Sequence, residues 1–306
     1  MKALFYRMLV GLTRLFGWGF FSLVAGGIAV GYYIFFPKRV AVSSRFYATL
    51  FPQRGRLYHR WCALRQFLDF TFVFRDRMLL ADRGGGLTTT FDGWERLRDA
   101  MGSGGGVLLM SHIGNWEVAA RLLKQTLPDL KLMLYMGVKE KEQIEGLQKQ
   151  SVRQSDIRVV GVDAAGGSAF DIVEGIRFLR GGGLVSLTGD RLWQEEQRSL
   201  PARFLGRSIR LPAAPYVLAM AAGAPIFVFF ALRTGGRHYH FSASAPIRVP
   251  ASDRTQRESA MARAAQQYAD LLEAAVRRHP FQWHHFEAFL ERPLNSIPFC
   301  SRRQDH

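Results

Sequence analysis

Cysteine is scarce in this chain of 306 residues, which contains only Cys62 and Cys300. Two isolated cysteines exclude a disulfide framework and a zinc site built on cysteine pairs. Glycine clusters at 84–86, 104–106 and 181–183 fit neither the phosphate-loop nor the dinucleotide pattern, so no nucleotide site is predicted. No G-x-S-x-G sequence occurs either, which removes the nucleophile elbow of the α/β-hydrolases.

Acidic residues are missing from the first 68 positions, and the whole chain has a formal net charge of +16. The same N-terminal stretch carries ten well-spaced cations: Lys2, Arg7, Arg14, Lys38, Arg39, Arg45, Arg54, Arg56, Arg60 and Arg65. Such an excess of positive charge predicts an acidic partner, whether an anionic membrane, an acidic carrier protein, a phosphorylated lipid or nucleic acid. Nucleic acid is disfavoured because no helix-turn-helix, RRM or zinc-finger signature accompanies the charge.

An uncharged apolar segment, Leu15–Pro37, lies between these cations. A helix needs about 20 apolar residues to span a bilayer, so this segment is long enough. Its five glycines weaken it as a helix, and cations flank both ends; no small-x-small cleavage site of a signal peptide follows. We predict a membrane-associating segment over residues 1–45 and a second domain over 46–300, with spanning and shallow insertion both left open.

The rest of the chain is organised around Val107–Leu122. An apolar run ends at Ser111-His112, Gly114 and Asn115 form a turn, and a helical pattern starts with Trp116 and Glu117. A neutral histidine at the end of a strand can remove a proton from a hydroxyl or amine, and a carboxylate can hold its other ring nitrogen. We therefore predict His112 as a general base that is oriented by Glu117. An ordinary loop histidine beside a glutamate that favours the helix dipole is the alternative.

Apolar strand patterns alternate with helical patterns from this motif to the C-terminus. Strands are expected near 130–138, 158–163, 183–191, 226–232 and 238–244, and helices near 140–154, 170–180, 212–222 and 257–279. This alternation predicts an α/β fold, a layered domain in which a mixed central sheet is flanked by helices.

The segment SHIGNWE at 111–117 resembles the catalytic motif of the bacterial lipid A biosynthesis acyltransferases, within the wider lysophospholipid acyltransferase superfamily. Further matches follow in family order: TGDR at 188–191, ARFLGR at 202–207, LPAAPYVLAM at 211–220 and HPFQW at 279–283. The resemblance implies transfer of a fatty acyl group from acyl carrier protein or acyl-CoA to a hydroxyl or amine of a lipid or glycolipid. It also implies the cytoplasmic face of the bacterial inner membrane, and no cofactor or metal.

The supporting motifs give five further candidate residues. Asp190 and Arg191 are expected to position the acceptor or to stabilise an oxyanion, unless they form only an ion pair within the loop. Arg203 and Arg207 are expected to dock the phosphopantetheine arm or acidic surface of the donor, unless they belong to a solvated basic face. Asn115 is expected to contact a substrate.

Three departures from the family pattern bear on the acceptor. First, Asp-Gln is usual in the family where this chain has Asp190-Arg191. Second, the sequence YMGVKEKE at 135–142 stands where the family usually has a segment with arginine and asparagine. Third, the Gln-Trp pair is followed by HHFEAF at 284–289 and not by the basic residues typical of the family. This pattern resembles the branch associated with aryl-polyene and flexirubin-type pigments, so an aryl-polyene lipid or an amino-acid lipid is an alternative acceptor. A basic surface-binding protein without catalysis and a serine hydrolase also stay open as functions. His238 and His240 alternate along a strand, for which a structural role is favoured over metal binding.

Overall fold

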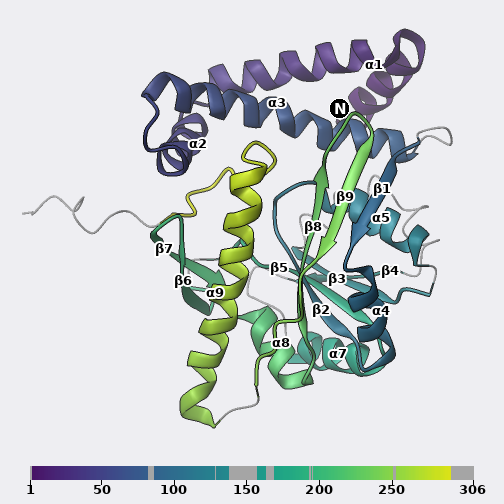
Figure 1. Ribbon diagram of the computed structural model, residues 1–306. Coiled ribbons are helices and arrows are strands. Elements are labelled where there is room, and N and C mark those ends of the chain that lie inside the picture. The colour runs from purple at the N-terminus through teal and green to yellow at the C-terminus, as the bar shows by residue number, and fades with distance from the viewer. Residues whose placement is uncertain are drawn as a thin grey trace, which may run out of the picture.

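The computed structural model describes residues 2–81, 86–127, 129–137, 157–162, 169–192, 194, 196–250 and 253–290. Within them the chain forms an α/β structure around a seven-stranded mixed sheet, with a separate two-stranded hairpin (Figure 1). This confirms the predicted fold class.

The strand order in the sheet is β1-β9-β8-β2-β5-β3-β4. The strands are β1 (Thr88–Asp92), β2 (Gly106–Met110), β3 (Leu132–Gly137), β4 (Ile157–Val162), β5 (Leu184–Thr188), β8 (Ile226–Arg233) and β9 (His238–Ala243). All neighbouring pairs are parallel except β8 with β9. The central strands β2 and β5 therefore end at the same edge, where loops and functional side chains gather in sheets of this kind.

Helices cover both faces of the sheet and enclose two apolar cores. One core packs the strands against α4 (Trp94–Gly102) and α5 (Trp116–Thr126). The other packs them against α7 (Ala169–Arg180), α8 (Ala214–Ala222) and α9 (Arg254–Arg278). Strands buried on both faces are apolar at nearly every position, as β2 and β8 are, because neither face meets water.

Three N-terminal helices form a layer across one end of the sheet domain (Figure 1). They are α1 (Lys2–Phe35), α2 (Pro37–Leu50) and α3 (Arg56–Ala81), and we call them the α1–α3 platform. Along α1, the stretch Leu15–Phe35 is long and apolar enough to cross a membrane, judged by length and composition alone, and 17% of it is buried. Its helix breaks at Gly17, which takes φ 79°. The boundary predicted at residue 45 falls inside α2.

The hairpin of β6 (Ser199–Phe204) and β7 (Arg207–Pro212) was not predicted. Its two-residue turn places both Leu205 (φ 52°) and Gly206 (φ 73°) in the left-handed region, as a tight turn with the twist of β-strands requires. The hairpin packs on α9, where Gln266 bonds the backbone of Arg203 in both directions.

Most of the other predicted elements are confirmed to within a few residues. The helix expected at 140–154 lies outside the described residues. Strand β1 was not predicted. Helix α4 follows it and begins after Gly93, which has φ 78° and no side-chain cap.

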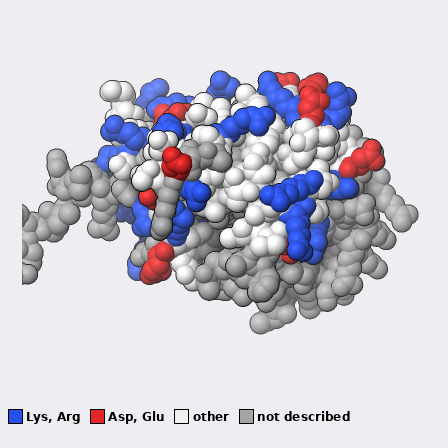
Figure 2. Space-filling model, turned by 90° about the horizontal axis from the view of Figure 1, so that it is seen from below, with Lys and Arg blue, Asp and Glu red and all other residues white. Residues whose placement is uncertain are grey.

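Charge is distributed differently on the face opposite the platform. There, basic side chains are interspersed with acidic and uncharged ones (Figure 2). In the first 68 residues every charged side chain is basic. The excess of basic over acidic side chains is therefore concentrated in the N-terminal part of the chain, which forms the platform.

Candidate active site

His112 is held in a short loop between β2 and α5. The loop runs against β8: Gly114 takes φ 75°, and a Cβ at this position would collide with the backbone carbonyl of Ala231. Asn115 donates its backbone N–H to that same carbonyl (3.1 Å), and Gly114 donates to Gln282 (2.9 Å). Only glycine allows both the positive φ and this close approach, so the turn in the motif has a structural cause.

The carboxylate that contacts His112 is that of Asp190. Asp190 Oδ1 lies 2.8 Å from His112 Nδ1, and Asp190 Oδ2 accepts the backbone N–H of His112 at 2.8 Å. Trp283 Nε1 donates to the same Oδ2 at 2.9 Å. Burial alone would raise the pKa of Asp190, but His112 and Trp283 hold it well below its ordinary value. A buried, ionised carboxylate therefore receives the Nδ1–H of the imidazole and leaves Nε2 as its basic atom.

Glu117, expected to hold the imidazole, does not contact it. Its Oε1 is paired with Arg77 of α3, and its Oε2 is buried without a hydrogen-bond partner. Burial raises the pKa of Glu117, although Arg77 and Arg121 oppose that effect. The expectation of contact fails because the first turn of α5 faces α3, whereas the imidazole faces the end of β5.

Asn115, expected to contact a substrate, is 2% exposed. Its side-chain oxygen caps α5 by accepting the N–H of Val118 (3.3 Å), and its amide donates to Val73 and Tyr239 (3.4 and 3.5 Å). This geometry is typical of an N-cap, which satisfies a backbone donor at the start of a helix. It gives Asn115 a structural role and leaves it almost no surface for a substrate.

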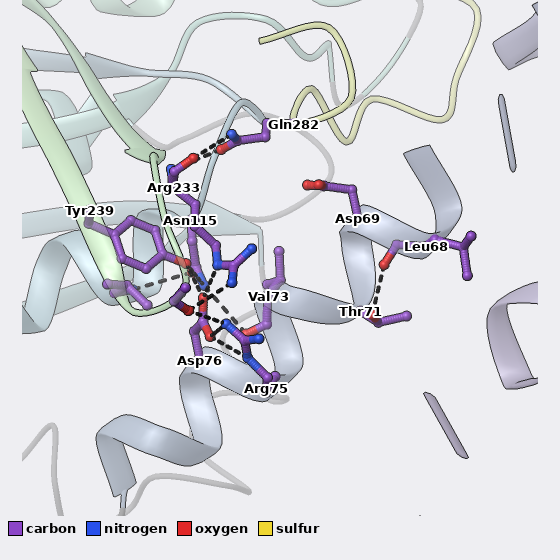
Figure 3. Close-up of polar contacts among 12 residues, drawn as sticks. Leu68, Asp69, Thr71, Val73, Arg75, Asp76, Asn115, Arg233, Tyr239 and Gln282 are labelled. Carbon is purple, nitrogen blue, oxygen red and sulfur yellow. Dashed lines mark hydrogen bonds and ion pairs between the residues drawn. The ribbon is translucent and has the colours of Figure 1, made fainter. Parts of the chain in front are cut away.

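A polar cluster beside Asn115 joins the platform to the sheet (Figure 3). Asp76, which is fully buried, accepts the hydroxyl of Tyr239 at 2.6 Å and pairs with Arg75 at 2.7 Å. Arg233, at the end of β8, lies 3.3 Å from the same carboxylate. Such a network fixes the position of α3, and with it Arg77, relative to the His112 loop.

The three predicted arginines occupy different places. Arg191 pairs with Glu287 at 2.8 Å, next to Asp190. Arg203 lies directly opposite Ser208 in the hairpin and faces outward, where it is exposed. Arg207 lies opposite the buried Phe204, and side chains of directly opposed residues share a face, so it points inward. Arg203 and Arg207 therefore do not form one cluster.

Two cavities flank the site. A strand-end cavity of about 50 Å³ lies at the ends of β2, β3 and β5; its walls are Met110, Ser111, His112, Trp116, Leu134, Tyr135, Met136, Ser186, Leu187 and Thr188. An α2 cavity of about 370 Å³ lies between the platform and the C-terminal segment; its walls are Val42, Arg45, Phe46, Ala48, Thr49, Arg207, Trp283, His285, Glu287, Ala288, Phe289 and Leu290. His112 opens on the first cavity, and apolar side chains line both.

Sequence reasoning did not single out Arg77, Trp283 or His285 as residues of the site. The ring of His285 stacks on Trp283 (centroids 5.2 Å apart) and meets His112 edge-on (5.8 Å). Burial lowers the pKa of His285. The adjacency of Trp283 to two histidines was the only available signal, and it says nothing of what they contact.

His238 and His240 bond to threonines of the neighbouring β1. His238 lies 2.8 Å from Thr88 and 3.1 Å from Thr90, and His240 lies 3.0 Å from Thr90. These cross-strand contacts are the structural role that was expected for them. They also account for the parallel attachment of β1 to the sheet.

Comparison with known proteins bears on most of the chain. Residues 56–291 match the family model described as bacterial lipid A biosynthesis acyltransferase. Comparison with individually curated proteins gave no match. The family match begins at α3 and includes the His112 loop, Asp190, the hairpin and Trp283. The chain therefore belongs to the bacterial lipid A biosynthesis acyltransferase family and is an acyltransferase.

Proposed function

We propose that this enzyme moves a fatty acyl group from an acyl thioester, carried by acyl carrier protein or CoA, to a hydroxyl or amine of a lipid or glycolipid, with His112 as general base. The observation that carries the proposal is the bond between His112 Nδ1 and the buried carboxylate of Asp190 (2.8 Å). It fixes the tautomer whose Nε2 can accept a proton, and it stabilises the imidazolium that results.

In the proposed reaction, Nε2 removes the proton of the acceptor as its oxygen or nitrogen attacks the thioester carbonyl. The tetrahedral intermediate then expels the thiolate, which takes the proton from the imidazolium; an ester or amide forms and a C–S bond breaks. Glu117, whose buried carboxylate pairs with Arg77, is assigned to the support of the His112 loop. We assign Arg191 to the developing oxyanion or to acceptor positioning.

The outward-facing Arg203 of the hairpin supports docking of an acidic donor. Arg203 is exposed and lies on the open face of β6, where water-borne acyl carrier protein or CoA can reach it. We place the enzyme at the cytoplasmic face of the bacterial inner membrane, because acyl thioesters are supplied there and the α1–α3 platform is apolar and basic.

The acceptor follows less directly from the structure. A phosphorylated glycolipid of the lipid A class is the first candidate, on family grounds. An aryl-polyene or amino-acid lipid is the second, because Arg191 replaces the usual glutamine and the chain continues with His284-His285 after Trp283.

Mass spectrometry of lipid extracts tests the proposal. Cells producing the wild-type chain should contain a lipid that is heavier by one acyl group and that is absent when His112→Ala is produced at the same level in the membrane. Acylation that persists with His112→Ala would refute the base assignment. The mass of the product identifies the acceptor.

A further inference from the structure

The geometry points to the α2 cavity as the binding site of a membrane-resident anionic acceptor, whose negative group lies between Arg45 and Arg207. This inference rests on the proposed function and adds to it a site and a ligand class. It follows from the size of the cavity, its charges and its position between the platform and His112.

Size separates the two cavities. A volume of about 50 Å³ at the strand ends is close to that of one or two water molecules. The α2 cavity, about 370 Å³, falls in the range typical of sites for small organic ligands. Its apolar floor is formed by aromatic rings in mutual contact: Trp283 lies 4.9 Å from Phe46 and 5.0 Å from Phe289, centroid to centroid.

Charge selects the ligand class. Neither Arg45, exposed on α2, nor Arg207, on the inner face of the hairpin, has an ion pair or hydrogen bond from its guanidinium within the described part of the chain. The one carboxylate in the wall, Glu287, is already paired with Arg191 (2.8 Å). Two unmatched guanidinium groups over an aromatic floor suit a ligand with an apolar body and an anionic group such as a phosphate.

Position favours the acceptor over the donor. Arg45 belongs to α2, which is joined through Phe36 to α1, whose outward face exposes Phe35 (79%) and other large apolar side chains. A lipid lying in a membrane against α1 therefore reaches the cavity past α2. At the inner end of the cavity, His285 is both a wall residue and the ring that meets His112 at 5.8 Å. The anionic group is thus held one side chain away from the base, and the reacting hydroxyl or amine of the same lipid extends past His285 to reach Nε2.

Titration calorimetry with dodecyl phosphate, on the full chain in neutral detergent micelles, tests the site. Because the partition of the probe into micelles is common to all variants, differences between variants report on the protein. Arg45→Ala and Arg207→Ala should each weaken binding about tenfold, as expected for loss of a charge-assisted contact. Arg203→Ala, on the opposite face of the same hairpin, is the matched control and should leave probe binding unchanged. Equal affinity in all four proteins would overturn the inference.

Further experiments identify the class of ligand that binds in the α2 cavity. Dodecyltrimethylammonium, with the same tail and the opposite charge, should bind the wild type no better than it binds Arg45→Ala. Ala48→Trp, which fills the cavity from an exposed helix position, should abolish dodecyl phosphate binding. Displacement of the probe by lauroyl-CoA would show that the cavity serves the donor and would overturn the acceptor assignment. His112→Ala should still bind the probe, so failure of the catalytic proposal and failure of this one are distinguishable.

Discussion

Helix α1 of the platform leaves several large apolar side chains on its surface, whereas the sheet domain buries most of its own. On α1, Leu15, Leu23 and Phe35 are 74%, 75% and 79% exposed. On β8, the residues from Ile226 to Leu232 are all buried. A folded domain places its apolar side chains inside, so a row of large apolar side chains left outside indicates a non-aqueous partner. The two regions share one chain but differ in where their large apolar side chains lie, and His112 lies near their junction.

The largest effect is expected in the sheet domain, at Asp190. Asp190→Asn keeps the shape of the side chain but removes the charge that holds the imidazole tautomer. By analogy with the same change in serine proteases, we expect kcat to fall by about 10³- to 10⁴-fold. The steady-state rate of acyl transfer from a lauroyl thioester tests this expectation. Co-sedimentation of the variant with vesicles is the control. Membrane binding should be unchanged, and an active Asp190→Asn enzyme would remove Asp190 from the mechanism.

The ion pair between Arg77 and Glu117 joins the two regions, and breaking it should destabilise both. The side chain of Glu117 is 11% exposed and that of Arg77 is 21% exposed. Arg77→Met leaves the largely buried carboxylate of Glu117 without the cation that opposes the rise of its pKa, which should lower the free energy of unfolding by about 3 kcal/mol. Chemical denaturation followed by circular dichroism measures this change.

Asp99→Asn provides the matched control for that measurement. Its ion pair with Arg98 spans 4.0 Å and is exposed on both sides (58% and 76%), so only a small change is expected. Replacing both partners, as Arg77→Met with Glu117→Leu, should recover part of the lost stability, because no buried charge is then left unpaired. Equal losses in Arg77→Met and Asp99→Asn would mean that the Arg77 pair does not hold the regions together.

A smaller effect is expected on the platform side. Leu23→Asp should weaken binding to anionic vesicles about tenfold or more, because a fully exposed leucine contributes roughly 1.5–3 kcal/mol when it enters an apolar phase. Val173→Asp, at an exposed apolar position (47%) on α7 of the sheet domain, is the matched control and should not change vesicle binding. Similar losses in both variants would show that the platform is not the membrane-facing surface.

The same contrast explains what the sequence could predict. The His112 loop was predictable because its signals are local: a buried strand, a glycine turn and a helix start within Val107–Leu122. The identity of the carboxylate was not, because Asp190 is 78 positions from His112, and the sequence analysis assigned the imidazole to the nearby Glu117 alone. Glu117 instead pairs with Arg77, 40 positions earlier on a helix with almost no amphipathic pattern to show which way it faces.

The hairpin was missed for a different reason. Its turn, Leu205-Gly206, lacks the Asn-Gly or Asp-Gly pair typical of two-residue hairpins, and Pro201 and Pro212 disfavour strands. Without the hairpin, Arg203 and Arg207 read as one basic cluster. Pairing with Ser208 and Phe204 places them on opposite faces, and this separation is a property of strand register that composition does not contain.

Asp69, the first acidic residue of the chain, stands at the junction of the two regions and gives the smallest effect. Figure 3 shows its carboxylate on α3 without a hydrogen bond to the other residues drawn, and His284 Nε2 is 4.0 Å away. Burial raises its pKa to about 6, against the partial opposition of Arg233 and Arg65 and with support from Asp76. Between the ordinary pKa of 3.8 and about 6, the folded chain therefore holds a proton that the unfolded chain has lost.

The sign of the resulting stability change follows from that difference in bound protons. The contribution of Asp69 to the free energy of unfolding falls as pH rises from about 4 to about 6. Above that range the buried carboxylate is ionised, and its destabilising effect is complete. Asp69→Asn removes the penalty, so the variant should gain about 1 kcal/mol over wild type at pH 7.5, a figure reduced for the solvent that reaches the carboxylate, and nothing at pH 4. The unfolding temperatures of both proteins, measured from pH 4 to 8, report this difference in stability. A difference in unfolding temperature that stays constant with pH would mean that Asp69 does not take up a proton in this range. Asp69 would then be an ordinary ionised side chain at the junction.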